Sequence, residues 1–371
     1  MKISVTLLAV MAGVLFLSLS LLLVGHRHLP IVHLVLAAGV LPLILGAMIQ
    51  FTPVLTRTRP AGLWITLLPF GATLTAAAVV TALEQDRRDW VWPLALWMMV
   101  LVMLLMGWIA KRAGMALDGA HPGVRWYQSA LFCLLSGLAV MVLALLQPQY
   151  WSPLRTLHLH LNLIGFIGMT AVGTLQVLLP TVAGYKDDQT ARRLCCHLKY
   201  VLLGSWLAAV GAAWLRPISW LAVPLWFFPL IALLRPVWPH RYQIMRSDHA
   251  GATISLIGAI IGFMLTLLSG IPIMLHWMAA EDSVPLFLML FVLPLVTGAL
   301  SYLWPLWLRG VDLQRQQLAR VLLSYGGSLR TALWLGSGLL LVAGLRDIAL
   351  PLTVVVVLVF VMQMLVAWVK S

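Results

Sequence analysis

Long apolar segments separated by short polar gaps run through the whole chain, and prolines, glycines and charged residues gather in the gaps. A helix needs roughly 20 mostly apolar residues to cross the ~30 Å hydrocarbon layer of a bilayer. The sequence therefore predicts an all-α integral membrane protein, a single polytopic domain over residues 1–371 with about 12 transmembrane helices. The predicted spans are residues 3–24, 30–52, 61–83, 91–110, 126–147, 157–183, 198–215, 218–234, 250–275, 285–308, 328–345 and 349–369.

The composition supports this class and excludes a water-soluble domain. Of the 371 residues, 62% are hydrophobic and 9% are charged, and the mean hydropathy is +1.00. The apolar run after Met1 and Lys2 extends to Val24, which is longer than the apolar core of a cleaved signal peptide, so it is predicted to be the first span. The predicted partner is therefore the lipid bilayer.

The net charge of +13 indicates orientation rather than nucleic-acid binding, because the basic residues are scattered among short loops. Of the 24 Lys and Arg residues, 18 fall on the side that holds the N-terminus and six on the other side. By the positive-inside rule, the richer side is cytoplasmic. We expect a multi-pass protein of the bacterial inner membrane with both termini in the cytoplasm. No acidic residue lies in the middle of a predicted span, which disfavours an ion-coupled pump.

A short motif recurs in three of the predicted spans. Residues 40–47 read VLPLILGA and residues 292–299 read VLPLVTGA. A glycine followed seven residues later by a proline occurs at Gly46, again at Gly173 and again at Gly298. Self-similarity at a fixed period is typical of repeated architecture, although apolar helices share a small alphabet and chance is the alternative. The pattern predicts three pseudo-symmetric four-helix units, approximately residues 1–115, 116–240 and 241–371.

Two histidines share a position in this repeat. His33 and His160 each lie 13 residues before the repeated glycine, and Pro285 takes that place in the third copy. Neutral imidazole is a common ligand of heme iron and of copper. We therefore predict that His33 and His160 bind a cofactor, with His158 as a further metal ligand. His158 projects roughly 200° around a regular helix from His160. The alternative is that all three are interfacial residues that hydrogen-bond water or a carbonyl group.

The topology and these histidines together resemble subunit I of the heme-copper oxidases and nitric oxide reductases. The stretch HLHLNLIGFIGMTAVGTLQVLLPTVAGY, residues 158–185, is also similar to the opening of the related NnrS membrane proteins. The resemblance implies that His33 is a ligand of a low-spin heme and that His158 or His160 is a copper ligand. The family's tenth helix also supplies two histidines and its seventh a pair, whereas residues 286–289 and 212–215 here contain none. The resemblance therefore implies a degenerate member without a complete oxygen-reducing centre.

Two hypotheses for the function follow. The first is a membrane protein that binds heme b, copper or both, and that serves nitric oxide or metal stress or electron transfer; whether it is an enzyme stays open. The second is a cofactor-free structural or assembly subunit that binds a partner membrane protein. Neither hypothesis involves nucleic acid.

Overall fold

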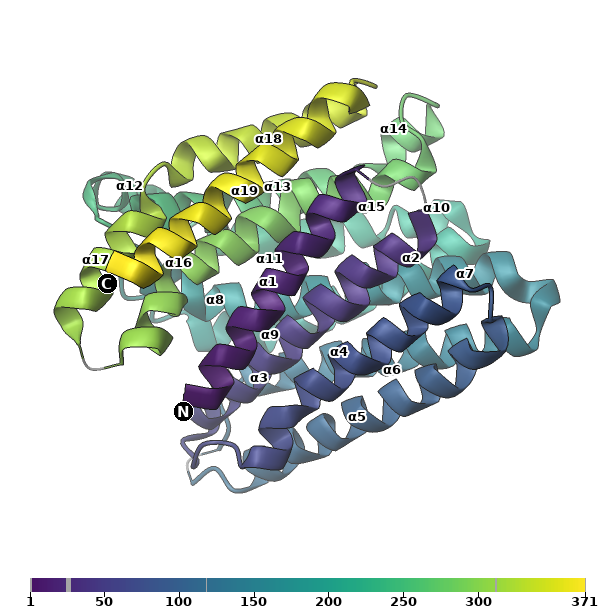
Figure 1. The fold of residues 1–371 in the computed structure, drawn as a ribbon, viewed down its shortest axis with the longest axis horizontal. Coiled ribbons are helices and arrows are strands. Elements are labelled where there is room, and N and C mark those ends of the chain that lie inside the picture. The colour runs from purple at the N-terminus through teal and green to yellow at the C-terminus, as the bar shows by residue number, and fades with distance from the viewer. Residues whose placement is uncertain (1, 25–27, 118, 311, 371) are drawn as a thin grey trace.

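The computed structural model describes residues 2–24, 28–117, 119–310 and 312–370, apart from the side chains of residues 2–7, 9, 23, 24, 28 and 309. Within these ranges the chain is a bundle of helices without a strand (Figure 1). The segments η1, η3 and η5 are π-helical, η2 and η4 are 3-10 turns, and the others are α-helices. In chain order they are α1 (Lys2–Val24), α2 (His28–His33), η1 (Leu34–Val40), α3 (Leu41–Thr56), α4 (Leu63–Glu84), α5 (Arg88–Gly114), α6 (Gly123–Leu146), η2 (Pro148–Tyr150), α7 (Trp151–His160), η3 (Leu161–Gly168), α8 (Met169–Ala183), α9 (Thr190–Trp214), α10 (Arg216–Ser219), α11 (Ala222–Leu234), α12 (Val237–Arg246), α13 (Ala250–Leu267), α14 (Gly270–Met274), η4 (Ala280–Asp282), α15 (Ser283–Phe287), η5 (Leu288–Val292), α16 (Leu293–Arg309), α17 (Leu313–Ser324), α18 (Gly327–Val342) and α19 (Arg346–Lys370).

Ten helical segments of the described chain are long and apolar enough to cross a membrane, which confirms the all-α membrane class. They are Leu29–Thr56, Leu63–Glu84, Arg88–Gly114, Gly123–Leu146, Pro148–Ala183, Thr190–Trp214, Arg216–Leu234, Ala250–Met274, Ala280–Leu308 and Arg346–Lys370. Each corresponds to one of the twelve predicted spans. The predicted first span corresponds to α1, which contains the shorter apolar stretch Val10–Leu22. The predicted eleventh corresponds to α18, which has only 16 residues.

Different helices lie at the two ends of the bundle, and both chain termini lie at one of them. The start of α1 and the end of α19 lie at the same end, together with α12 and α17 (Figure 1). We call this the proximal end. The helices α2, α7, α10 and α14 lie at the opposite end, which we call the distal end. An even number of crossings brings both termini to one end.

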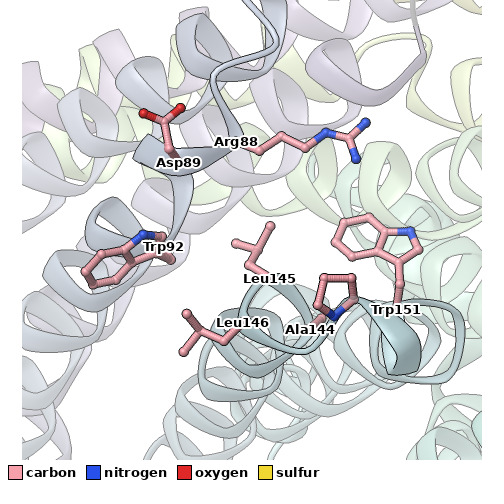
Figure 2. Close-up of a pocket in the computed structure, with 8 residues that line it drawn as sticks. Arg88, Asp89, Trp92, Ala144, Leu145, Leu146 and Trp151 are labelled. Carbon is pink, nitrogen blue, oxygen red and sulfur yellow. The ribbon is translucent and has the colours of Figure 1, made fainter.

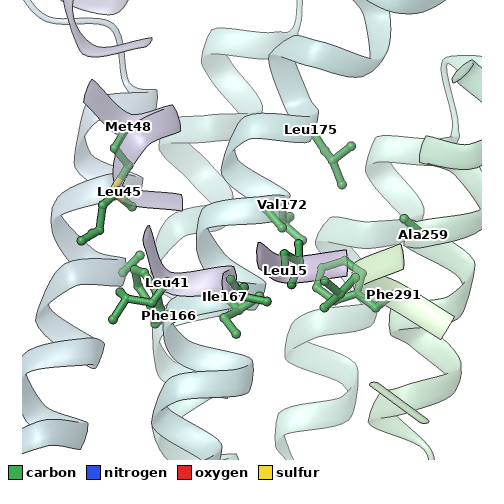
Figure 3. Close-up of a cluster of buried hydrophobic side chains, with 14 of the residues drawn as sticks. Leu15, Leu41, Leu45, Met48, Phe166, Ile167, Val172, Leu175, Ala259 and Phe291 are labelled. Carbon is green, nitrogen blue, oxygen red and sulfur yellow. The ribbon is translucent and has the colours of Figure 1, made fainter. Parts of the chain in front are cut away.

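The three segments that carry the repeated glycine are the most buried of the ten. The buried share of the most apolar stretch is 50% in Leu29–Thr56 and 83% in both Pro148–Ala183 and Ala280–Leu308, against 28–44% in the other seven. Their side chains meet in one apolar core, where Leu41, Phe166 and Phe291 lie near Leu15 of α1 (Figure 3). Lipid is as apolar as this core, so close packing rather than escape from water holds the helices together.

Each of these three central segments contains a π-helical stretch shortly before its repeated glycine. The stretches η1, η3 and η5 end six, five and six residues before Gly46, Gly173 and Gly298, respectively. In two of them a proline, Pro42 or Pro294, follows within two residues. A proline lacks the amide hydrogen that an α-helix requires and crowds the preceding turn. The wider π turn accommodates both effects.

The repeated glycines lie where helices approach closely. A methyl group added at Gly46 would lie 2.6 Å from a terminal carbon of Leu8, and one at Gly173 would lie 2.8 Å from Cβ of Trp126. At Gly298 it would lie 3.0 Å from the carbonyl oxygen of Ala252. In each case the neighbour belongs to the helix that starts the same predicted unit, namely α1, α6 or α13.

The contacts among helices also recur. The central helix α3 contacts α1 and α6, α8 contacts α6 and α13, and α16 contacts α13 and α1. Each central helix therefore touches the first helix of its own predicted unit and the first helix of the next. The helices α5 and α6, α11 and α13, and α19 and α1 also pack against each other, so the last long helix of each predicted unit contacts the first helix of another.

We predict that Gly173→Ala destabilises the protein by about 1–3 kcal/mol, because the added methyl group overpacks the contact with Trp126. Thermal unfolding of the detergent-solubilised protein measures this as a lower Tm. The matched control is Gly107→Ala, since nothing lies within 4 Å of a methyl group placed there; its Tm should be unchanged or slightly raised. Equal Tm values for the two variants would contradict the close packing at Gly173.

Candidate functional site

His33 and His160 occupy the same place in two of the central segments. His33 is the last residue of α2 and directly precedes η1, and His160 is the last residue of α7 and directly precedes η3. In the third central segment, Phe287 directly precedes η5. Single π turns inside α-helices are rare and are frequent at functional sites. The two candidate ligands therefore each lie immediately before a π-helical stretch.

The hydrogen bonds of these histidines fix which ring nitrogen carries the proton. Nδ1 of His33 lies 3.0 Å from the carbonyl oxygen of Leu29, and Nδ1 of His160 lies 2.9 Å from that of Thr156. A carbonyl oxygen only accepts, so Nδ1 donates in both rings and Nε2 keeps its lone pair. Metal-binding histidines usually have this arrangement, with the second nitrogen bonded to a carbonyl or carboxylate.

His158 has the same tautomer but a different partner. Its Nδ1 donates to the carbonyl oxygen of Gly137 in α6 at 2.9 Å. The amide nitrogen of Asn162 donates to the carbonyl oxygen of His158 at 2.7 Å. A methyl group at Gly137 would lie 2.9 Å from that amide nitrogen. Gly137 and Asn162 thus position His158, and sequence reasoning missed both; the only signal for Asn162 was its spacing of four residues from His158.

His33 and Arg155 are the charged groups that act on the imidazole of His158, and Arg155 also acts on that of His33. All three residues belong to α2 and α7, which lie at the distal end (Figure 1). Among the described residues, no comparable interaction joins His33 to His160, so the predicted pocket shared by those two stays a prediction.

The third central segment has no ligand at the matching place. Pro285 and Phe287 are buried there. Phe263 of α13 stacks on Phe291 with ring centroids 4.3 Å apart, and Phe287 meets Phe291 edge to face at 5.4 Å. Aromatic packing therefore replaces histidine in this unit. Across the described part of the chain, no three His, Cys, Asp or Glu side chains are grouped closely enough to hold a metal ion.

An open groove lies at the distal surface beside the start of α7. It has a volume of about 510 Å³ and is lined by Arg88, Asp89, Trp92, Ala144, Leu145, Leu146, Pro148 and Trp151. Figure 2 shows Trp92 and Trp151 on either side of the two leucines, with Arg88 above them. Indole rings favour the interface between membrane and water. The groove therefore marks the distal membrane surface on the side of the bundle formed by α5, α6 and α7.

The proximal end contains an ion pair that the sequence analysis counted only as loop charge. Arg193 of α9 binds Asp187 in the loop after α8, and the two side chains are 12% and 6% exposed. Burial raises the pKa of the Asp187 carboxyl group, but the hydrogen bonds and charge of Arg193 outweigh it and hold the pKa below its usual value. The pair ties the α8–α9 loop to the bundle.

We predict that Asp187→Asn destabilises the protein by about 3–5 kcal/mol, because it leaves a buried guanidinium group without its anion. The folded-state pKa of Asp187 lies below the unfolded value of about 3.9, so the pair stabilises above that value and the contribution is lost as the pH falls through the folded-state pKa. The Tm difference between wild type and variant should therefore shrink from pH 7 to pH 3. Asp188→Asn is the control, because its ion pair with Lys186 is exposed; a Tm loss as large as that of Asp187→Asn would contradict the assignment.

Comparison with protein-family models, with curated proteins and with solved structures finds no match to this chain. The resemblance to subunit I of the heme-copper oxidases is therefore a prediction from topology and motif.

Proposed function

We propose that this is a twelve-span protein of the bacterial inner membrane, built from three four-helix units around a pseudo-threefold axis, with both termini in the cytoplasm. The proposal adds α1 and α18 to the ten candidate spans. It is supported by the repeated contacts of α3, α8 and α16 and by the common end of the two termini (Figure 1). The excess of basic residues on the side of the termini gives the orientation.

We further propose that the protein binds a metal cofactor at its distal end through His33 and His158, with His160 beside them. The observation that carries this is the pair of histidines, His33 and His160, placed directly before a π-helical turn with Nε2 unprotonated. His158 shares that tautomer and is the ring within electrostatic range of His33. Neutral imidazoles with available Nε2 atoms are the donors that copper and heme iron accept.

A copper ion fits this donor set better than a heme. The space between the central helices is filled by apolar side chains such as Leu41, Phe166 and Phe291 (Figure 3), and the tenth predicted span offers packed phenylalanines in place of histidines. A single ion needs only two imidazoles at the distal end. When bound, copper would supply one-electron chemistry, which agrees with a role in electron transfer or in nitric oxide or metal stress.

The alternative function is a cofactor-free structural or assembly subunit. One observation favours it: among the described residues, no three His, Cys, Asp or Glu side chains lie close enough together to hold a metal ion. In that case the hydrogen bonds to Gly137, Leu29 and Thr156 only satisfy imidazoles inside the membrane.

We predict that the purified protein takes up about one copper ion per chain and that His33→Ala or His158→Ala lowers the affinity at least tenfold. Titration with copper, followed by metal analysis and an optical spectrum, measures the binding. The matched control is His240→Ala, because His240 also donates from Nδ1 to a carbonyl oxygen of its own helix, at 2.9 Å, but lies at the proximal end.

The variants also separate the candidate ligands. A loss of binding in His160→Ala without one in His158→Ala would assign the site to His33 and His160. Binding that survives in both His33→Ala and the double variant of His158 and His160 would place the cofactor elsewhere. A metal-free, colourless protein that takes up no copper would favour the cofactor-free subunit.

We predict that a reporter fused after Leu345 is periplasmic and that one fused after the C-terminal Ser371 is cytoplasmic, because α18 and α19 are proposed as the last two spans. Alkaline phosphatase and green fluorescent protein fusions report the two locations. A cytoplasmic signal at both points would mean that α18 does not cross the membrane, and the count of twelve would be wrong.

A further inference from the structure

Arg330 is a charged side chain buried inside the bundle near its proximal end. It lies in the first turn of α18 and is 5% exposed. It donates to Oε1 of Gln363 at 2.8 Å and, over longer distances of 3.3 and 3.4 Å, to the carbonyl oxygen of Leu323 and to Oγ of Ser301. Its guanidinium group also lies 4.5 Å from the ring centre of Phe360. All of these partners are neutral.

The positive charge of Arg330 is therefore uncompensated by the protein as described. No carboxylate of the described residues forms an ion pair with it, and its Nε atom is buried without an acceptor. A buried cation without an anion is costly, and ionisable groups inside membranes commonly face a partner or a ligand. The contact with Phe360 offsets only part of this cost. An anion from outside the protein would compensate this charge.

A groove on the outside of the bundle has Gln363, the hydrogen-bond partner of Arg330, in its lining. The groove lies between α17 and α19 and has a volume of about 480 Å³. Its lining is apolar except at Tyr325 and Gln363 and comprises Leu322, Tyr325, Val355, Leu358, Val359, Met362, Gln363 and Val366. Gln363 joins the groove to the buried charge, because it accepts from Arg330 and donates to the carbonyl oxygen of Tyr325 at 3.1 Å.

The shape and position of the groove match one leaflet of a bilayer. Tyr325 lies in the turn between α17 and α18 at the proximal end, where lipid headgroups are expected. Along α19 the lining runs from Val366 back to Val355, which corresponds to roughly 16 Å of helix. This is about half of the ~30 Å hydrocarbon layer. A polar end at the membrane surface and an apolar length of one leaflet are the features of a phospholipid site.

We propose that this groove binds one anionic phospholipid of the proximal leaflet. Its phosphate lies at the Tyr325–Gln363 end, and an acyl chain lies along Leu358, Val359 and Met362. An anionic lipid is preferred over a zwitterionic one because the charge of Arg330 lies one hydrogen bond behind Gln363 in a medium of low dielectric constant. The basic residues of the same membrane surface attract anionic lipids as well. This site is independent of the histidines at the distal end.

The experiment compares two phospholipids with identical acyl chains, phosphatidylglycerol and phosphatidylcholine, added to the delipidated full-length protein. Native mass spectrometry counts the lipids retained per chain. We expect one phosphatidylglycerol to be retained at least fivefold more than phosphatidylcholine. Val359→Trp fills the groove and should abolish this retention. Leu365→Trp is the matched control, because Leu365 is equally exposed, at 54% against 53%, but does not line the groove; its retention should equal that of wild type.

A second variant tests the charge separately from the groove. Arg330→Gln should lower the retention of phosphatidylglycerol at least fivefold, to the level of phosphatidylcholine, while Tm shows that the protein is folded. If this variant does not fold, the comparison of Val359→Trp with Leu365→Trp still decides. Equal retention of both lipids by wild type, or unchanged retention in Val359→Trp, would overturn the proposal. So would a dimer of the chain that Val359→Trp dissociates, because the groove would then be an interface between two copies.

Discussion

The structure depends on one constraint, that the hydrocarbon layer offers no water to the backbone. Every amide and carbonyl group inside it needs a partner within the protein, and a helix supplies that partner within a single segment. Buried hydroxyl groups follow the same rule: Thr52, Thr170 and Thr297 each donate to the carbonyl oxygen four residues earlier, at 2.7 Å. The helices can then pack closely because glycines remove side-chain bulk at their crossings, as at Gly173 against Trp126.

The histidines of the proposed metal site and two buried arginines lie near the two ends of the bundle. At the distal end, His33, His158 and His160 each satisfy one ring nitrogen with a carbonyl oxygen and keep the other unprotonated. Near the proximal end, Arg193 is neutralised by Asp187, whereas Arg330 has only neutral partners. Between them, hydrophobic side chains such as Phe166 and Phe291 pack together (Figure 3).

The π-helical segments connect the fold with the proposed metal site. They interrupt the three most buried helices at similar distances from the repeated glycines, and in two of the three the preceding residue is a histidine. A wider turn changes how the residues before it project relative to the helix that follows; His158 and His160 themselves both lie in the regular α-helix α7. Where the third segment has Phe287 instead, aromatic packing with Phe291 takes the place of a polar site.

The sequence by itself determined the membrane class, the approximate position of the spans and the recurrence of the motif that contains Gly46, Gly173 and Gly298. Hydrophobic segment length and the spacing of glycine and proline are local properties of the chain. It also singled out His33, His158 and His160 as candidate ligands. Only the tertiary structure decided that Gly137 and Asn162 are the hydrogen-bond partners of His158, and that Arg330 and Arg193 are buried rather than simple loop charges. These facts depend on which faces of distant helices meet, and an apolar helix in lipid carries little periodic signal for its inner face because lipid and protein core are equally apolar.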